Sequence, residues 1–201
     1  LRQQLLTKKI TTIDSVLYTH FHADQTHGIN DLRVFYLKSR KKIPIYADKL
    51  TAKYLYKTFT YCFIKKYDYP AILDLKPLKE NFTIGNSINN INIKAIKVKH
   101  GLINSIAYIV NSKIAYISDA NELFKKDYNS FINLKYLVID CLRFDKHPSH
   151  FNLNDVKEIV NLLKPKKTIL TNLHSDLDYN ELLKILPKSI IPGYDGLTIN
   201  I

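Results

Sequence analysis

The chain has 201 residues and a formal net charge of +12, from 30 lysines and arginines against 18 aspartates and glutamates. That length suits one domain with a substantial core, so we expect a single domain over residues 1–201. The lysines are scattered, and the chain is rich in Ile, Asn, Lys and Tyr but has no Met and no Trp. Such a composition is typical of an AT-rich genome, so the charge does not by itself indicate a nucleic-acid ligand. It is compatible with a small anionic substrate, and nucleic-acid binding stays open.

The sequence indicates neither a membrane protein nor a disulfide scaffold. No apolar run approaches the roughly 20 residues that cross a bilayer, and the chain does not open on a secretory signal pattern. Cys62 and Cys141 lie far apart without a CxxC spacing, which is typical of a reducing compartment. We therefore expect a cytoplasmic protein without a membrane partner, and the sequence leaves a homodimer open.

In chain order, the first informative stretch follows the short apolar run Val16–Tyr18, which predicts a buried strand. Residues 19–28 read Thr-His-Phe-His-Ala-Asp-Gln-Thr-His-Gly, and a helical pattern comes next. His20, His22 and Asp24 alternate by two, so in an extended chain they project to one side. Imidazole and carboxylate ligands suit Zn, Fe or Mn, and the lack of thiolates argues against a zinc finger. The stretch therefore predicts a metal-binding loop.

The rest of the chain alternates predicted strands and helices, with no internal repeat and no linker that divides it. Strands are expected at Ile43–Ala47, Phe82–Ile84, Ile91–Val98, Ser105–Val110, Lys113–Ile117, Tyr136–Ile139 and Ile169–Thr171, with a terminal strand after Gly196. Helices are expected at Lys49–Phe63 after an Asp48 cap, from Asn152 to Pro165, and from Asp178 onward. Asn111-Ser112 reads as a tight hairpin turn. Residues 64–80, with Pro70 and Pro77, read as an irregular connection.

Three of these strands end in a residue able to bind a metal. His100 follows the strand around Val98, Asp119 follows Ile117, and His174 comes soon after Thr171. One such residue would usually be an ordinary polar residue at a strand end. Because the same arrangement recurs three times, we interpret these residues as further ligands.

The histidine motif identifies a family. His20-x-His22-x-Asp24 resembles the signature of the metallo-β-lactamase fold hydrolases, His-x-His-x-Asp-His. The wider string from Tyr18 to Arg33 is similar to the branch that contains the phosphoribosyl 1,2-cyclic phosphate phosphodiesterases. The resemblance implies an α/β fold, a four-layer αβ/βα sandwich of two mixed sheets with helices outside. Because the chain begins inside a helical pattern, it also implies that the N-terminal strands of one sheet are lacking.

The resemblance implies two divalent metal ions, Zn or Mn. It assigns His20, His22 and His100 to the first ion, Asp24 and His174 to the second, and Asp119 as the bridge between them. Two ions at roughly 3.5–4 Å can hold a hydroxide at neutral pH and stabilise charge on a phosphoryl oxygen. As a ligand of the second ion, Asp24 also counts among the catalytic residues.

Gln25 departs from the family pattern because the family has a histidine at this position. An amide oxygen is a weaker ligand than imidazole for transition metals, so the second metal should bind less well. His27 lies two residues on, which in a helix is roughly 200° around the axis, so a helix would not let it replace the missing ligand, while in a loop replacement stays open. We expect His27 to be a neighbour that contributes to the rim or to a hydrogen bond. A one-metal hydrolase, a weakened two-metal enzyme and an inactive remnant all stay open.

The segment from Asp140 to Phe151 is another loop at the end of a strand. Its His-Pro-Ser-His-Phe run, residues 147–151, is similar to the family's His-Pro-Thr-His-Phe. The resemblance implies that His150 faces the substrate as general acid and that His147 supports it. Asp140 is expected to orient a metal-bound histidine.

The sequence thus predicts a metal-dependent phosphodiesterase that acts on a cyclic or nucleotide-like phosphodiester. One alternative is an impaired or inactive remnant that acts at most as a binding domain. The other is a nuclease like the tRNA 3′-end-processing endonucleases. Asp119-Ala-Asn-Glu122 and the lack of an obvious inserted tRNA-binding arm weigh against that second alternative.

Overall fold

The computed structural model describes residues 1–85 and 90–200 of the chain. The described residues form two compact units, the first of residues 1–79 with 84–85, the second of residues 80–83 with 90–200. The helices in the described part of the chain are all too short or too polar to span a bilayer.

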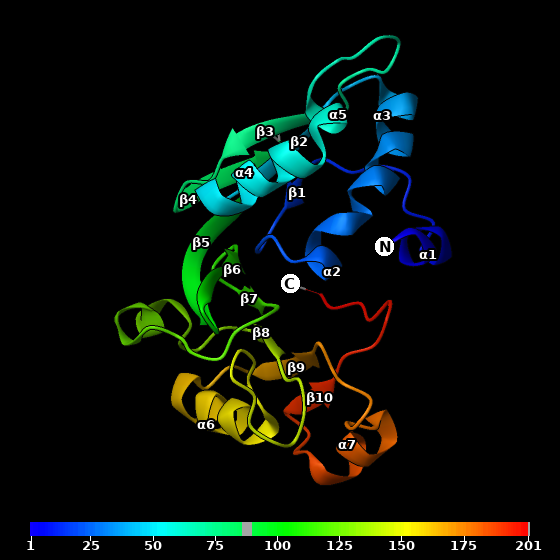
Figure 1. Cartoon of the computed structure of the whole chain (residues 1–201). Helices are drawn as coiled ribbons and strands as arrows, with labels where there is room; N and C mark the ends of the chain where they lie inside the picture. The colour runs from blue at the N-terminus through cyan, green and yellow to red at the C-terminus, as the bar shows by residue number, and fades with distance from the viewer. Residues whose placement is uncertain (86–89, 201) are drawn as a thin grey trace. The chain divides into compact units, whose positions relative to one another are not determined.

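The first unit is built on a three-stranded parallel sheet (Figure 1). Its strands lie in the order β1 (Val16–Leu17), β2 (Ile43–Ala47) and β3 (Leu73–Pro77). Its helical segments are α1 (Arg2–Thr7), α2 (Ala23–Thr26), the 3-10 helix η1 (His27–Leu32), α3 (Arg33–Ser39), α4 (Lys49–Thr58) and α5 (Thr60–Phe63).

Alternation along β2 builds the core of this unit. Ile43, Ile45 and Ala47 are buried together with Leu55 of α4 and Leu73 of β3. Successive side chains of a strand point to opposite faces. Burial of every second residue therefore gives β2 one apolar face toward the helices. The predicted strand and the helix start after Asp48 are confirmed, since the Asp48 carboxylate accepts a hydrogen bond from the Thr51 backbone N–H at 3.0 Å.

Two expectations for this unit are wrong. The connection predicted over residues 64–80 contains β3, which pairs along its whole length with β2. Pro70 and Pro77 favour an irregular connection. The short alternating run Leu73-Asp-Leu-Lys-Pro77 is nevertheless long enough for an edge strand. The helix predicted over Lys49–Phe63 breaks at Phe59, whose backbone leaves the helical region at φ −120° and ψ 38°.

The second unit is built on a seven-stranded mixed sheet in the order β10-β9-β8-β7-β6-β5-β4. Its strands are β4 (Asn81–Gly85), β5 (Asn90–His100), β6 (Ile103–Val110), β7 (Ile114–Ile117), β8 (Tyr136–Asp140), β9 (Lys167–Thr171) and β10 (Ile190–Pro192). Strands β7 to β10 are mutually parallel, whereas β5, β6 and β7 alternate in direction. The 3-10 helix η2 (Lys125–Ser130) and helices α6 (Leu153–Leu163) and α7 (Tyr179–Ile185) complete the unit.

The predicted hairpin turn between β6 and β7 is confirmed. Asn111 and Ser112 have φ values of +50° and +51°, the left-handed conformation that a two-residue type I′ turn requires at both positions. This turn fixes the register of the strand that leads to Asp119.

Helix α6 supplies much of the second core, with Leu153, Val156 and Leu163 buried against the sheet. Figure 1 shows α6 and α7 beside β8, β9 and β10. The predicted Asn152 start is confirmed as a reciprocal cap. Asn152 Oδ1 accepts from the Asp155 N–H at 2.8 Å, and the Asn152 N–H donates to the Asp155 carboxylate at 3.2 Å.

The terminal strand predicted after Gly196 is wrong, because residues 197–200 form no strand. The sheet instead ends on β10, which follows α7 and pairs in parallel with β9. A parallel pair needs a crossover connection, and α7 provides it. The three-residue Ile190–Pro192 run is too short to be recognised from periodicity alone.

Asn152→Ala removes the cap of α6 and should lower the free energy of unfolding by about 1 kcal/mol. The measurement is urea denaturation followed by circular dichroism. Asn154→Ala is the matched control, since Asn154 is exposed in the first turn of the same helix. Equal destabilisation by both substitutions would contradict a specific role of the cap.

Burial raises the pKa of Cys62 to about 11 and that of Cys141 to about 12. Because the thiolate is the reactive species, neither thiol should react with Ellman's reagent in the folded protein at mildly alkaline pH. Both should react in guanidinium chloride. Asn154→Cys, which places a thiol on the exposed side of α6, is the positive control. Rapid labelling of the folded wild type would refute the burial of these thiols.

Candidate active site

In the second unit, four strands deliver polar residues to one edge of the sheet. Strands β7, β8 and β9 are parallel, and β5 points the same way because two antiparallel pairings separate it from β7. Their carboxyl ends therefore meet at the same edge. The residues at or just beyond these ends are His100, Asp119, Asp140 and Asn172.

His100 is held in a single orientation. It is 3% exposed, and its Nδ1–H donates to the Ser149 carbonyl at 2.7 Å, because a carbonyl oxygen can only accept. With the proton on Nδ1, the lone pair is on Nε2. Metal-binding histidines usually donate their other ring N–H in this way. Gly101 makes the approach possible. Its φ is +59°, and a Cβ there would lie 2.9 Å from the Cβ of Ser149.

Asp119 is brought beside His100 by backbone pairing after β7. The Asn121 N–H donates to the Lys99 carbonyl at 2.9 Å, and the Lys99 N–H donates to the Glu122 carbonyl at 3.0 Å. This holds the loop against the end of β5. Ligand atoms of His100, Asp119 and His150 consequently all lie within 4.8 Å of one another.

His150 and Asp140 form a buried pair. His150 Nδ1 lies 2.7 Å from Asp140 Oδ2, and the same oxygen accepts from the Ala120 N–H at 2.9 Å. Burial raises the pKa of Asp140 to about 6, although both hydrogen bonds and the nearby imidazole act to lower it. Asp140 is predicted to orient a histidine. The histidine that it contacts is His150, which the resemblance assigns as the general acid.

Asn172 was not singled out from the sequence, yet its side chain joins this cluster. Its Nδ2 donates to Asp140 Oδ1 at 3.1 Å and more weakly to Asp119 Oδ1 at 3.4 Å. The same nitrogen lies 3.3 Å from His150 Nδ1. Its φ of +60° suits asparagine better than most residues. The signal in the sequence that could indicate Asn172 is a polar residue directly after an apolar strand. The sequence analysis instead assigns the ligand to His174, two residues further on.

His147 and His174 lie differently. The ring of His147 is 5.1 Å from that of His150, and its Nδ1 accepts from the Ser149 N–H at 3.3 Å. Burial first, and then the nearby His150, Arg143 and His100, lower the pKa of His147. The structure does not bring His174 into the group of His100, Asp119 and His150. Its side chain is 53% exposed and its Nδ1 lies 3.1 Å from Asp176 Oδ1.

In the first unit, the structure brings His20 and His22 together. Their ring centroids are 4.5 Å apart in an edge-on arrangement, and His20 is buried. Thr19 Oγ1 lies 3.1 Å from His20 Nδ1. The backbone turns into α2 directly after His22, whose carbonyl accepts from the Thr26 N–H and hydroxyl at 3.0 and 2.9 Å. The alternation predicted to place both rings on one side therefore describes their geometry.

Asp24 and Gln25 interact with each other in the first turn of α2. Gln25 Nε2 donates to Asp24 Oδ2 at 2.8 Å. Burial opposes ionisation of Asp24, but the Gln25 hydrogen bond and the two histidines together hold its pKa below the usual value. His27 lies away from this pair, with its Nε2 3.2 Å from the Tyr54 hydroxyl and its ring against Phe59. This agrees with its interpretation as a neighbour.

The donors of the second unit fit a divalent metal ion. Asp119 is 3% exposed, and its Oδ2 is buried without a hydrogen-bond partner among the described residues. A buried carboxylate oxygen without a donor is costly unless a cation compensates it. Imidazole nitrogen with carboxylate oxygen is a donor set that suits Zn or Mn.

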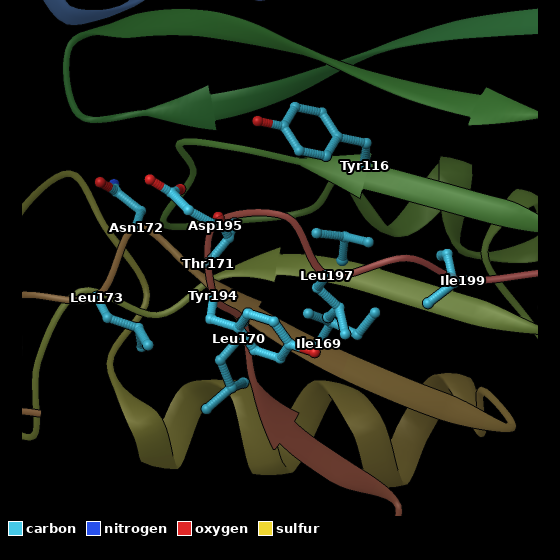
Figure 2. A pocket seen from close by; sticks show the side chains of 12 residues that line it. Tyr116, Ile169, Leu170, Thr171, Asn172, Leu173, Tyr194, Asp195, Leu197 and Ile199 are labelled. Atoms are coloured by element: carbon cyan, nitrogen blue, oxygen red, sulfur yellow. The ribbon is translucent and has the colours of Figure 1, made fainter. Parts of the chain in front are cut away.

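A cavity of about 560 Å³ adjoins this cluster within the second unit. Its floor is a row of cross-strand partners on one sheet face: Tyr116, Val138 and Ile169. Figure 2 shows Asn172 and Asp195 at one end of the cavity, and Leu197 and Ile199 toward the other. Because Asn172 also contacts Asp119, the polar end of the cavity opens beside the cluster.

The family comparison agrees with this geometry. The family model described as "Beta-lactamase superfamily domain" matches residues 1–172. The chain belongs to this superfamily and has the metallo-β-lactamase fold. The fold class predicted from His20, His22 and Asp24, an α/β sandwich of two sheets, is thereby confirmed.

Solved structures show the same fold. A diphosphatase of the PhnP family superposes with a TM-score of 0.88 at 28% identity, over 100% of this chain and 76% of that one. The short form of human tRNase Z gives 0.70 at 17% identity, over 100% and 84%. Zinc-bound PqqB from Methylobacterium extorquens gives 0.72 at 11% identity, over 93% and 73%. The last two likenesses concern the fold alone.

Among curated proteins, an octanoyltransferase of Porphyromonas gingivalis is 27% identical over 199 residues. The match covers 98% of this chain but only 39% of that protein. The chain thus spans well under half the length of this relative.

Proposed function

We propose that the chain is a metal-dependent phosphodiesterase that cleaves a P–O bond in a small, anionic, cyclic or nucleotide-like phosphodiester. The observation that carries the proposal is the cluster at the sheet edge, where His100, Asp119 and His150 converge and Asp140 holds His150. The similarity to a PhnP-family diphosphatase at 28% identity supports phosphoryl chemistry, since a diphosphate also contains a P–O bond open to attack by water.

The proposed metal ligands are the residues that the sequence resemblance assigns, among them His20, His22, His100 and Asp119. A bound Zn or Mn ion supplies Lewis acidity toward a phosphoryl oxygen and lowers the pKa of water. The chain's own contribution is to hold the donors rigidly, through the Ser149 carbonyl at His100 and the backbone pairing after β7 at Asp119.

His150 is the proposed general acid. Its Nδ1–H donates to Asp140, so the other ring nitrogen is the one that can pass a proton to the leaving oxygen. The Asp140 carboxylate stabilises the imidazolium form before that transfer and fixes the ring. His147 supports His150 by packing beside it.

The cavity beside Asn172 is the proposed place for the organic part of the substrate. Its apolar sheet floor, with Tyr116 and Tyr194 among the lining residues, suits a flat or sugar-like group more than a second phosphate. The net charge of +12 favours an anionic ligand. A nucleic-acid substrate, a homodimer, a cytoplasmic location and a single domain over the whole chain stay predictions.

The second candidate is a catalytically impaired binding domain. One observation favours it: Gln25, at the position where the sequence resemblance expects a metal-binding histidine, uses its amide to hold Asp24. Metal content and turnover together decide between the two candidates.

Asp119→Ala and His22→Ala should each abolish metal-dependent hydrolysis of bis(p-nitrophenyl) phosphate, because each removes a proposed ligand. Turnover with added Zn or Mn is the measurement, beside metal content by mass spectrometry. Asp145→Ala and His27→Ala are the controls, since both residues are exposed and lie outside the proposed ligands. Retained turnover in the Asp119 and His22 variants would contradict the assignment of these residues as metal ligands.

His150→Ala should affect substrates unequally. A general acid matters for a poor leaving group, so hydrolysis of an alkyl phosphodiester should fall by about 10²–10⁴-fold. The p-nitrophenyl ester needs little protonation of its leaving oxygen and should lose far less. The ratio of the two kcat values is the readout. An equal loss on both esters would argue that His150 binds metal or positions substrate.

A further inference from the structure

The three residues assigned to the second metal ion are engaged by other groups, each within its own unit. Asp24, in the first unit, accepts the Gln25 amide at 2.8 Å. Asp119, in the second unit, has its Oδ1 near the Asn172 amide at 3.4 Å, while only its Oδ2 has no donor among the described residues. His174 lies in an exposed pair with Asp176.

We infer that the chain binds one divalent metal ion, and that the carboxamides of Gln25 and Asn172 take over the contacts with Asp24 and Asp119 that a second ion would make. The inference rests on the proposed metal dependence. It concerns four side chains, Gln25, Asn172, Asp24 and Asp119. The substitution at position 25 alone predicts only weaker binding of the second ion.

The chemistry of the amides supports this replacement. A side-chain NH₂ group offers two donors and no positive charge, so it satisfies a carboxylate oxygen without binding an ion. Asn172 uses the same nitrogen toward two carboxylates, Asp140 at 3.1 Å and Asp119 at 3.4 Å. Two neighbouring carboxylates would otherwise repel each other, and a shared N–H donor or a shared cation relieves that repulsion.

The position of Asn172 strengthens the argument. It is the first residue after β9, at the edge where β5, β7 and β8 deliver His100, Asp119 and Asp140. An imidazole at this position would add a ligand beside Asp119. The residue present has no nitrogen lone pair, and its amide oxygen is a weak ligand for Zn.

The test is metal stoichiometry in the full chain. Wild type, loaded with excess Mn and desalted, should hold about one ion per chain by mass spectrometry and give a mononuclear Mn signal by electron paramagnetic resonance. The double variant Q25H/N172H supplies two imidazoles and should hold about two ions, with the spin coupling expected of ions roughly 3.5–4 Å apart. Histidine tolerates the positive φ at position 172 better than most residues.

The matched control is Q25L/N172G, which removes both amides without adding a ligand and keeps a residue suited to the positive φ. It should retain about one ion. Two coupled ions in the wild type, or no ion at all, overturn the inference. One ion in the wild type, with no increase in a folded Q25H/N172H variant, also overturns it, because imidazoles at these positions would then not restore a second ion.

Hydrolysis of bis(p-nitrophenyl) phosphate by the same samples separates this inference from the proposed function. Two ions with turnover refute the replacement by amides and leave the phosphodiesterase standing. One ion without turnover refutes the phosphodiesterase and leaves the replacement standing.

Discussion

The Asp140 carboxylate is fully buried, and the second unit is arranged around the donors it requires. It accepts from His150 Nδ1, from the Ala120 N–H and from Asn172 Nδ2, at 2.7, 2.9 and 3.1 Å. A buried carboxylate without such donors would be strongly destabilising. The three donors lie on the segments that follow β7, β8 and β9. Satisfying this one side chain therefore fixes three loops at the same sheet edge, and Asp119 lies on one of them.

The sequence was informative wherever one residue type permits few alternatives. Asp48 and Asn152 are helix caps, Asn111-Ser112 is a hairpin turn, and His20 with His22 follows a short strand, as predicted, although that strand is only partly buried. Each of these signals is local, because the physical cause lies within a few residues of the feature. The same locality made the strand-end positions of His100 and Asp119 readable, while their roles stay predictions.

What could not be read depends on partners far along the chain. Strand β3 is defined by pairing with β2, and β10 is defined by pairing with β9. Asn172 and His174 both follow β9, and it is the Asn172 side chain that contacts Asp119. Histidine is the more reactive type, so residue chemistry alone favours the wrong neighbour as the contact of Asp119.

The amide contacts also bear on how metal binding and folding are coupled. A centre that gathers carboxylates for two ions is held together by the ions themselves, so their removal exposes like-charge repulsion. Gln25 at Asp24 and Asn172 between Asp119 and Asp140 supply donors that remain when metal is absent. These donors are neutral, so the carboxylates they hold keep their negative charge. The Asn172 amide therefore favours a second unit whose sheet edge is formed before any metal binds.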